Sequence, residues 1–405
     1  MKRIAVLTIL LSLLVTPAWP EDAISPAEVK ISQARQAIAT SPQSADAYAA
    51  LGLALARRAR ETADTNYYRQ AEGAVAKSLE LTPDNREARR VRVWIKLGRH
   101  AFAEALAEAQ ALNRSAPDDL LIYAYLVDAN VELGNYAAAE EAAQWLLDMR
   151  PGNLAGLTRA AYLRELFGDV DGALELMAMA LTRTPPAEVE DQAWIITQMA
   201  HLELMRGRPA QAEQLAGEAL ARFPDYHYAL QTLGRIQSAQ GRHREAARTF
   251  ERHVALTPHP ENTFELARAL KQAGRSREAK AAFAEFENKA RAEMGGVDNA
   301  NRELVLFYAD HVGKPDEALR IARLEFAQRH DAFTRDVYAW ALHVNGKHQE
   351  AWREMTEALS VGIREAYMLE RAAAIARAAG DHRAARKYID QAHMLAPWLK
   401  KPGRG

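Results

Sequence analysis

The chain has 405 residues, and its 52 lysine and arginine residues almost balance its 53 aspartate and glutamate residues. This balance argues against a general nucleic-acid binder, because such proteins usually carry a strongly basic domain. The chain contains no cysteine, which excludes disulfides, thiol catalysis and cysteine-ligated metal. Its length alone suggests two or three domains, but an internal repeat favours one continuous array.

Residues 1–18 have the features of a secretory signal peptide. Lys2 and Arg3 precede an apolar run from Ile4 to Val15, and small residues around Ala18 suit cleavage. The run is shorter than the ~20 residues of a membrane-spanning helix, and no second run of that length follows. We therefore predict an exported chain without a membrane span in its mature form, located in a bacterial periplasm.

Residues 19–26 are predicted to form a flexible leader, and residues 27–42 a half-repeat that caps the array. The apolar residues of the second stretch follow helical spacing as far as Pro42. Proline ends the helix there because it lacks an amide donor and clashes with the preceding turn.

The next unit, from Pro42 to Pro83, is seven residues longer than the 34-residue interval from Pro83 to Pro117. Seven residues make about two helical turns. We expect a longer helix pair here, with a polar overhang from Arg57 to Asn66.

Glycine and alanine then recur in step. Eight hinge glycines are spaced by 34, 39, 34, 33, 39, 33 and 34 residues, and each is followed by alanine five positions later. A period of 20–50 residues is typical of a repeat architecture. The pattern predicts an all-α solenoid of about ten repeats over residues 43–397, followed by a basic tail at 398–405. The glycines are Gly134, Gly168, Gly207, Gly241, Gly274, Gly313, Gly346 and Gly380.

Each element of the pattern has a physical reason. Glycine past a helix end adopts a left-handed backbone without a Cβ penalty, and alanine lets two helices approach closely. Proline follows five of the eight glycines after seventeen residues, but Arg291, His330 and Ile363 replace it elsewhere, so those second helices need not stop. The two 39-residue spacings predict inserted loops at Pro185–Glu190 and Gly295–Asn299.

These residues resemble the tetratricopeptide repeat family. The best single match is Leu233-Gly234 with Gly241, Ala246, Phe250 and Pro258, and the resemblance covers essentially the whole mature chain. The stretch 336–342 resembles exported bacterial members whose role is unsettled. The resemblance implies antiparallel helix pairs stacked into a right-handed superhelix, with the first helix of each pair lining a concave groove.

In that arrangement, the residues six and thirteen positions before each hinge glycine face the groove. Tyr, Trp and Arg are enriched in binding hot spots, and an arginine pair one repeat apart can clamp an acidic or extended segment. Aromatic residues at this spacing also seal repeat interfaces, so both interpretations stay open. The candidate partner-binding residues are Tyr162, Trp194, His201, Tyr228, Arg235, Arg268, Phe307 and Trp340.

The sequence offers no catalytic or metal-binding pattern. His343 and His348 are five apart and His253 and His259 six apart, whereas metal ligands on one helical face are spaced by four. No phosphate-binding loop or nucleophile elbow is present. We predict that the chain is not an enzyme and holds no cofactor and no metal.

The favoured function is an exported, non-enzymatic scaffold or adaptor that binds a protein or peptide partner in its groove, and no nucleic acid. The alternative is an accessory factor for exported polysaccharide or outer-membrane assembly, in which Trp194, Tyr228, Phe333 and Trp340 stack on sugars. A catalytic domain hidden among the repeats is disfavoured, because the repeats leave too few residues for another fold. The partner and the oligomeric state stay open.

Overall fold

The computed structural model describes residues 25–399. The predicted signal peptide, most of the leader and most of the basic tail lie outside the described residues. Between residues 25 and 399, no helix combines the length and the apolar character needed to cross a bilayer.

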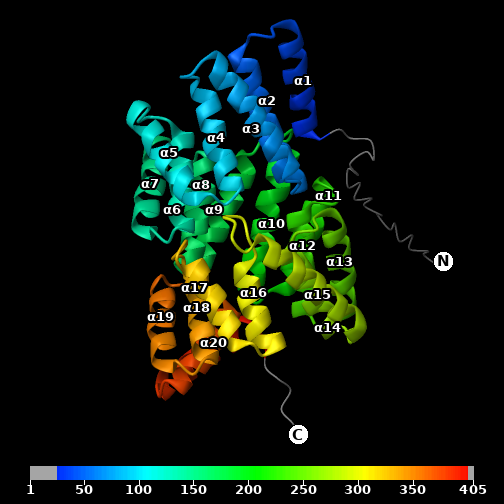
Figure 1. Cartoon of the computed structure of the whole chain (residues 1–405), viewed down its shortest axis with the longest axis vertical. Coiled ribbons are helices and arrows are strands. Elements are labelled where there is room, and N and C mark those ends of the chain that lie inside the picture. Colours follow the sequence, from blue (N-terminus) through cyan, green and yellow to red (C-terminus); the bar gives the residue numbers. More distant parts are fainter. Residues whose placement is uncertain (1–24, 400–405) are drawn as a thin grey trace, which may run out of the picture.

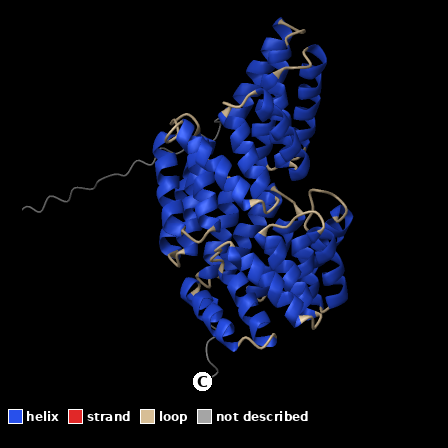
Figure 2. Cartoon of the chain, turned by 90° about the vertical axis from the view of Figure 1, so that its left-hand side faces the viewer, coloured by secondary structure: helices blue, strands red, loops and turns tan. Residues whose placement is uncertain are grey.

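Every regular element of the described residues is helical (Figure 2), so the predicted all-α solenoid is confirmed. A single helix, α1 (Pro26–Thr40), precedes ten consecutive helix pairs. The pairs are α2 (Ala45–Thr62) and α3 (Asn66–Leu81), α4 (Arg86–Gly98) and α5 (Phe102–Ser115), α6 (Leu120–Glu132) and α7 (Tyr136–Met149), α8 (Leu154–Leu166) and α9 (Val170–Arg183), α10 (Val189–Met205) and α11 (Pro209–Arg222), α12 (His227–Ala239) and α13 (His243–Leu256), α14 (Pro260–Gln272) and α15 (Ser276–Glu293), α16 (Asn301–Phe307) and α17 (Pro315–Phe326), α18 (Ala332–Val344) and α19 (His348–Ser360), and α20 (Ala366–Ala378) and α21 (His382–Leu395). The π-helical η1 (Tyr308–Val312) extends α16, and η2 (Pro397–Leu399) follows α21.

Polar side chains define where many first helices begin. At α6, the carboxylate of Asp119 accepts hydrogen bonds from the amides of Leu121 at 3.0 Å and Ile122 at 3.4 Å. Ser44, Asn85, Asn153 and Asp331 cap α2, α4, α8 and α18 in the same way. Such a cap satisfies amides that lack a partner within the helix and stabilises it by about 1 kcal/mol.

The hinges follow the expected geometry. All eight hinge glycines have positive φ, and the eight alanines that follow them are at most 3% exposed. The alanines therefore lie where the second helix of a pair contacts its neighbours, and a larger side chain there would overpack the contact.

The irregular spacings lengthen helices. Helices α2 and α3 have 18 and 16 residues, whereas α6 and α7 have 13 and 14. The predicted overhang from Arg57 is thus largely helical, since α2 continues to Thr62. The loop predicted at Pro185–Glu190 is wrong in part: α10 begins at Val189 and has 17 residues, so the insertion adds a helical turn.

The second inserted loop is confirmed, because residues 294–300 are not helical. Where proline is missing at Arg291, α15 continues to Glu293. Helices α17 and α19 nevertheless end at Phe326 and Ser360, so the absence of proline lengthens only one of the three second helices.

The superhelix is wound so tightly that distant repeats touch. Figure 1 shows α1–α3 at one end of the molecule and α18–α20 at the other, with α10 between them. The hydroxyl of Tyr136 in α7 accepts a hydrogen bond from the Ala332 amide, 196 residues away, at 2.8 Å. A Cβ atom built on Gly134 would lie 2.7 Å from the carbonyl oxygen of His330. The hinge between α6 and α7 thus contacts the start of α18.

Substitutions at two hinge glycines distinguish the cost of a left-handed backbone from the cost of disturbing the contact between the α6–α7 hinge and α18. Gly134 and Gly241 have φ of 80° and 73°, but a Cβ at Gly241 meets nothing within 4 Å. We expect Gly241→Ala to lower the free energy of unfolding by about 1–2 kcal/mol from the left-handed backbone alone. Gly134→Ala carries the same cost and displaces the start of α18, which adds about 1–3 kcal/mol.

Urea unfolding followed by circular dichroism measures both variants against the unsubstituted chain. Equal losses for Gly134→Ala and Gly241→Ala would show that the α6–α7 hinge does not contact α18.

Candidate functional site

The concave face of the superhelix contains a half-open cavity of about 400 Å³. Its walls come from helices on opposite sides of the superhelical turn and from the inserted loop after α15. It is lined by Arg60, Tyr68, Trp94, Leu97, Gly98, His100, Phe102, Asp128, Glu132, Tyr162, Tyr228, Glu261, Asn299, Arg302, Glu303 and Arg329. A second hollow of about 330 Å³ lies between the α12–α13 hinge and the end of α14 and contains no Phe, Tyr or Trp. We therefore centre the candidate site on the larger, central cavity.

Aromatic rings form much of the cavity wall. Tyr68 comes from α3, Trp94 from α4, Phe102 from α5, Tyr162 from α8 and Tyr228 from α12. The packing of the repeats around them fixes these rings, so they present apolar faces to the cavity at low entropic cost.

Each arginine of the wall, and the ring of His100, lies beside an acid. The His100 ring and Asp298 are 2.9 Å apart, Nε of Arg329 donates to Glu325 at 2.6 Å, and Arg302 lies 3.7 Å from Asp331. Arg60 binds Glu190 and Asp191. None of these five acids lines the cavity.

The carboxylates of the wall are mostly unpaired. Asp128 binds Arg159 at 2.6 Å. Glu132, Glu261 and Glu303 make no ion pair and no hydrogen bond to another side chain of residues 25–399. Burial raises the pKa of Glu132, and the charge of Asp331 raises it further. Burial and then the charge of Glu303 raise the pKa of Glu261 to about 7.

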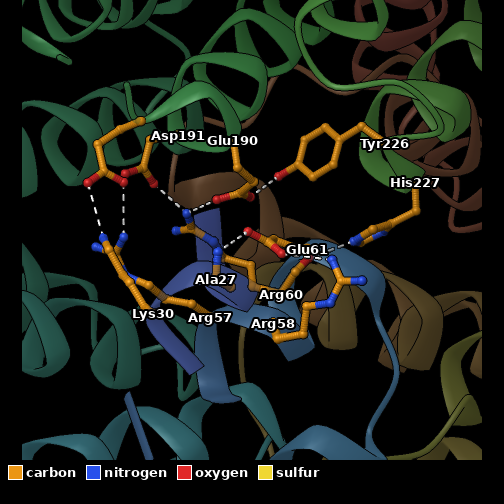
Figure 3. Close-up of polar contacts among 11 residues, drawn as sticks. Ala27, Lys30, Arg57, Arg58, Arg60, Glu61, Glu190, Asp191, Tyr226 and His227 are labelled. Atoms are coloured by element: carbon orange, nitrogen blue, oxygen red, sulfur yellow. Dashed lines mark hydrogen bonds and ion pairs between the residues drawn. The ribbon is translucent and has the colours of Figure 1, made fainter. Parts of the chain in front are cut away.

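At one end of the cavity, the last turn of α2 contacts the first turn of α10, and we call this contact the seam. Figure 3 shows its polar side chains. Arg60, in the last turn of α2, donates to Glu190 and Asp191 in the first turn of α10. Glu190 is 6% exposed and accepts a second hydrogen bond, at 2.5 Å, from the hydroxyl of the fully buried Tyr226. Burial raises the pKa of Glu190 against the opposing effect of the Arg60 charge. The Arg60 cation therefore offsets part of the free-energy cost of burying the Glu190 carboxylate.

Further contacts extend the seam on both sides of Arg60. Glu188 binds Lys30 at 3.2 Å and Arg57 at 3.0 Å, which adds α1 to the contact. His227 donates from Nε2 to the carbonyl oxygen of Arg60 at 2.9 Å. Burial lowers the pKa of His227 to about 4, so the ring is neutral at physiological pH and keeps the proton that this bond requires.

Of the candidate residues from the sequence, Tyr162 and Tyr228 line the cavity. Trp194 is half-buried among the hydrophobic clusters formed by α8–α12. Phe307 is 5% exposed and lies beside Phe283 and Phe286, with ring centroids 5.4 and 5.5 Å away. Phe307 therefore packs the core and offers almost no surface to a partner.

The remaining candidates already have partners within the chain. His201 pairs with Glu165 at 3.1 Å, and Nε of Arg235 donates to Glu265 at 2.7 Å. The structure does not join these residues and the two cavity tyrosines into one continuous strip.

Arg268 and Trp340 belong to the second half of the superhelix. The Arg268 guanidinium lies over the rings of Phe264 and Tyr367, at 5.8 Å from each centroid. The Trp340 indole donates to Asp310 at 2.9 Å and stacks on His343.

Sequence reasoning missed most of the cavity wall. The spacing rule does place Asp128 and Glu261 at groove-facing positions, six and thirteen residues before Gly134 and Gly274, but neither was among the partner-binding candidates, which were aromatic or basic. Tyr68, His100 and Phe102 lie on a second helix or at a hinge, where the rule does not look. Within residues 25–399, no three His, Asp or Glu side chains are arranged to hold a metal ion.

Comparisons with known proteins agree with this architecture. Family models described as tetratricopeptide repeat match residues 126–188 and 203–263. A structure of a human IFIT1 dimer with PPP-AAAA aligns at 14% identity and a TM-score of 0.50, covering 93% of this chain and 96% of that chain. A human IFIT1 dimer with m7Gppp-AAAA gives 14% identity, the same coverages and a TM-score of 0.51. A MamA structure aligns at 19% identity and a TM-score of 0.33, covering 43% of this chain and 93% of that chain. No curated protein matches the chain in sequence.

The Arg60 ion pairs are testable by substitution. Arg60→Met leaves Glu190 buried without its cation, so we expect the free energy of unfolding to fall by about 3 kcal/mol. Arg99→Met is the matched control, because Arg99 and Glu72 form an exposed pair that contributes at most about 1 kcal/mol. Adding Glu190→Gln to Arg60→Met should restore part of the loss. Urea midpoints measure all three, and equal effects of the two arginine substitutions would contradict this role of Arg60.

The raised pKa of Glu261 predicts a pH dependence of stability. Between about pH 4.5, its ordinary value, and about 7, the carboxyl is protonated in the folded chain and ionised in the unfolded chain. Its contribution to stability is therefore complete below pH 4.5 and is lost as pH rises through 7. Glutamine does not titrate, so Glu261→Gln should not lose this contribution. The stability of the variant relative to the unsubstituted chain should therefore rise from pH 5 to pH 8. A difference in urea midpoint that stays constant over this range would contradict the assignment.

Proposed function

The chain is a tetratricopeptide-repeat protein, and on that premise we propose that it is a non-enzymatic scaffold that binds a protein or peptide partner through its concave face. Helical-repeat proteins of this kind present extended concave surfaces to their partners. The proposal concerns which part of that surface is used and what it contacts.

The central cavity is the observation that carries the proposal. Five aromatic rings and three unpaired carboxylates face one space enclosed by the repeats. A monomer that served only to pack its own repeats would gain stability by pairing these partly buried acids or replacing them with apolar residues, because removing an unpaired charge from water is costly. Their presence favours a ligand that supplies the missing contacts.

The shape of the cavity limits how a partner enters. An α-helix with its side chains is about 10–12 Å wide, whereas a volume of about 400 Å³ is in the range of small-molecule sites. We therefore infer that a partner inserts a side chain or a chain end and rests the remainder of its surface on the rim.

Nucleic acid is a poor fit to this site. The human IFIT1 structures contain PPP-AAAA and m7Gppp-AAAA, but Glu132, Glu261 and Glu303 would face the phosphates of such a ligand here. The wall arginines are each engaged with an acid and are not free to neutralise a backbone. This charge distribution supports the prediction of a partner other than nucleic acid.

Export to the periplasm is part of the proposal and is supported by residues 1–18 alone. The alternative of a glycan-stacking face gains no support from the geometry. Of its four aromatic residues only Tyr228 lines the cavity, and the indole of Trp340 is bonded to Asp310.

Site-specific photo-crosslinking tests the proposal in the native compartment. A photoreactive phenylalanine analogue replaces Tyr228 in the cavity, or Arg248 on the exposed side of α13 as the matched control. We expect a heavier adduct containing one recurrent partner from position 228 and none from position 248. Adducts from position 248 alone would move the partner site to the outer surface and contradict the proposal.

A further inference from the structure

We propose that the central cavity binds an organic cation, an alkylammonium or guanidinium group. This inference rests on the proposed function in one respect, the molecule that carries the cation. That molecule is either a polypeptide with a basic side chain or a free amine. The pairing of charges in the wall, the rings around them and the size of the space all favour such a ligand.

The pairing of charges is asymmetric. The three arginines of the wall each lie beside an acid outside the cavity, and the His100 ring lies 2.9 Å from Asp298. Three of the four wall carboxylates, Glu132, Glu261 and Glu303, have no such partner within residues 25–399. The charge of Arg302 also acts on Glu303 and Glu132. Even so, the wall carboxylates and the acids bound to the wall arginines together outnumber the arginine cations, so the balance of charge around the cavity is negative.

The three unpaired carboxylates come from three different helices. Glu132 lies on α6, whereas Glu261 and Glu303 lie on α14 and α16. The last two are close enough for the Glu303 charge to raise the pKa of Glu261. A cation beside Glu261 and Glu303 would relieve this repulsion, because an opposite charge favours the ionised form.

The aromatic residues complete a site of this chemistry. Tyr68, Trp94, Tyr162 and Tyr228 surround the same space as the three acids. A ring face attracts a cation within about 6 Å of its centroid, and tryptophan and tyrosine do so better than phenylalanine. A cavity lined by aromatic rings and acidic groups suits an ammonium group on an aliphatic stem. The methylene groups of the stem pack against the rings.

An anion is disfavoured by the same residues. To bind one, Arg302 or Arg329 would have to leave Asp331 or Glu325, and the buried acid would lose its partner. The volume of about 400 Å³ is suited to one side chain or one small amine and is too small for a folded segment.

A calorimetric titration with three small probes tests the proposal, with the fluorescence of the chain as a second readout. N-acetyl-lysine N-methylamide carries the ammonium, its norleucine analogue has the same stem without the charge, and cadaverine is a free diamine. We expect saturable binding of at least one ammonium probe and none of the norleucine probe. Equal binding of the lysine and norleucine probes, or binding of neither ammonium probe, would overturn the proposal.

Substitution of the acids shows where the probe binds. Glu261→Gln and Glu303→Gln should each weaken binding at least about tenfold, since each removes a carboxylate that accepts a charge-assisted hydrogen bond from the ammonium. Glu218→Gln is the matched control, because Glu218 lies exposed on α11 and pairs with Arg222, and it should bind as the unsubstituted chain does. Unchanged binding in both cavity variants would place the probe elsewhere and overturn the proposal.

The source of the cation follows from the relative affinities. Tighter binding of cadaverine than of the lysine derivative assigns the cavity to a free amine, and the reverse order assigns it to a polypeptide side chain. Either order supports a cation site. Photo-crosslinking from position 228 is scored separately, so a failure to bind amines is distinguishable from the absence of a protein partner.

Discussion

The architecture depends on the contact between the extra turn of α2 and the extra turn of α10. There Arg60 supplies the positive charge for Glu190 and Asp191, which lie 130 and 131 residues further along the chain. A buried ion pair adds little net stability, but removing one of its two members is costly. The contact therefore acts mainly to specify how the two ends of the first superhelical turn meet. It converts an open groove into a cavity.

The fold was predictable because it depends on local geometry. Each hinge needs a left-handed residue and, five positions later, a side chain small enough for close helix contact, and Gly134 with Ala139 shows both requirements in one repeat. The closure of the superhelix was not predictable in the same way. The spacing revealed three insertions, but nothing local states that the first meets the second, or that Asp298 in the third binds His100. Those contacts join residues more than a hundred positions apart.

The candidate site was predictable in part for the same reason. The rule that first helices line the groove correctly placed Tyr162 and Tyr228, because it follows from the stacking of pairs. It did not show that Phe307 turns into the core or that Tyr68 and Phe102 join the wall, since tight winding brings second helices and hinges to the interior. Whether the candidate residues contact a partner stays a prediction.

The closed first turn is the central claim, and zero-length carbodiimide cross-linking of the unsubstituted chain tests it directly. Lys30 Nζ and Glu188 Oε1 are 3.2 Å apart across the seam, and both side chains are partly exposed. We predict an amide linking Lys30 to Glu188 in monomeric protein, detected by mass spectrometry, alongside the local link between Lys96 and Glu104, which are 3.1 Å apart. Recovery of the local link without the Lys30–Glu188 link would contradict the closed superhelix.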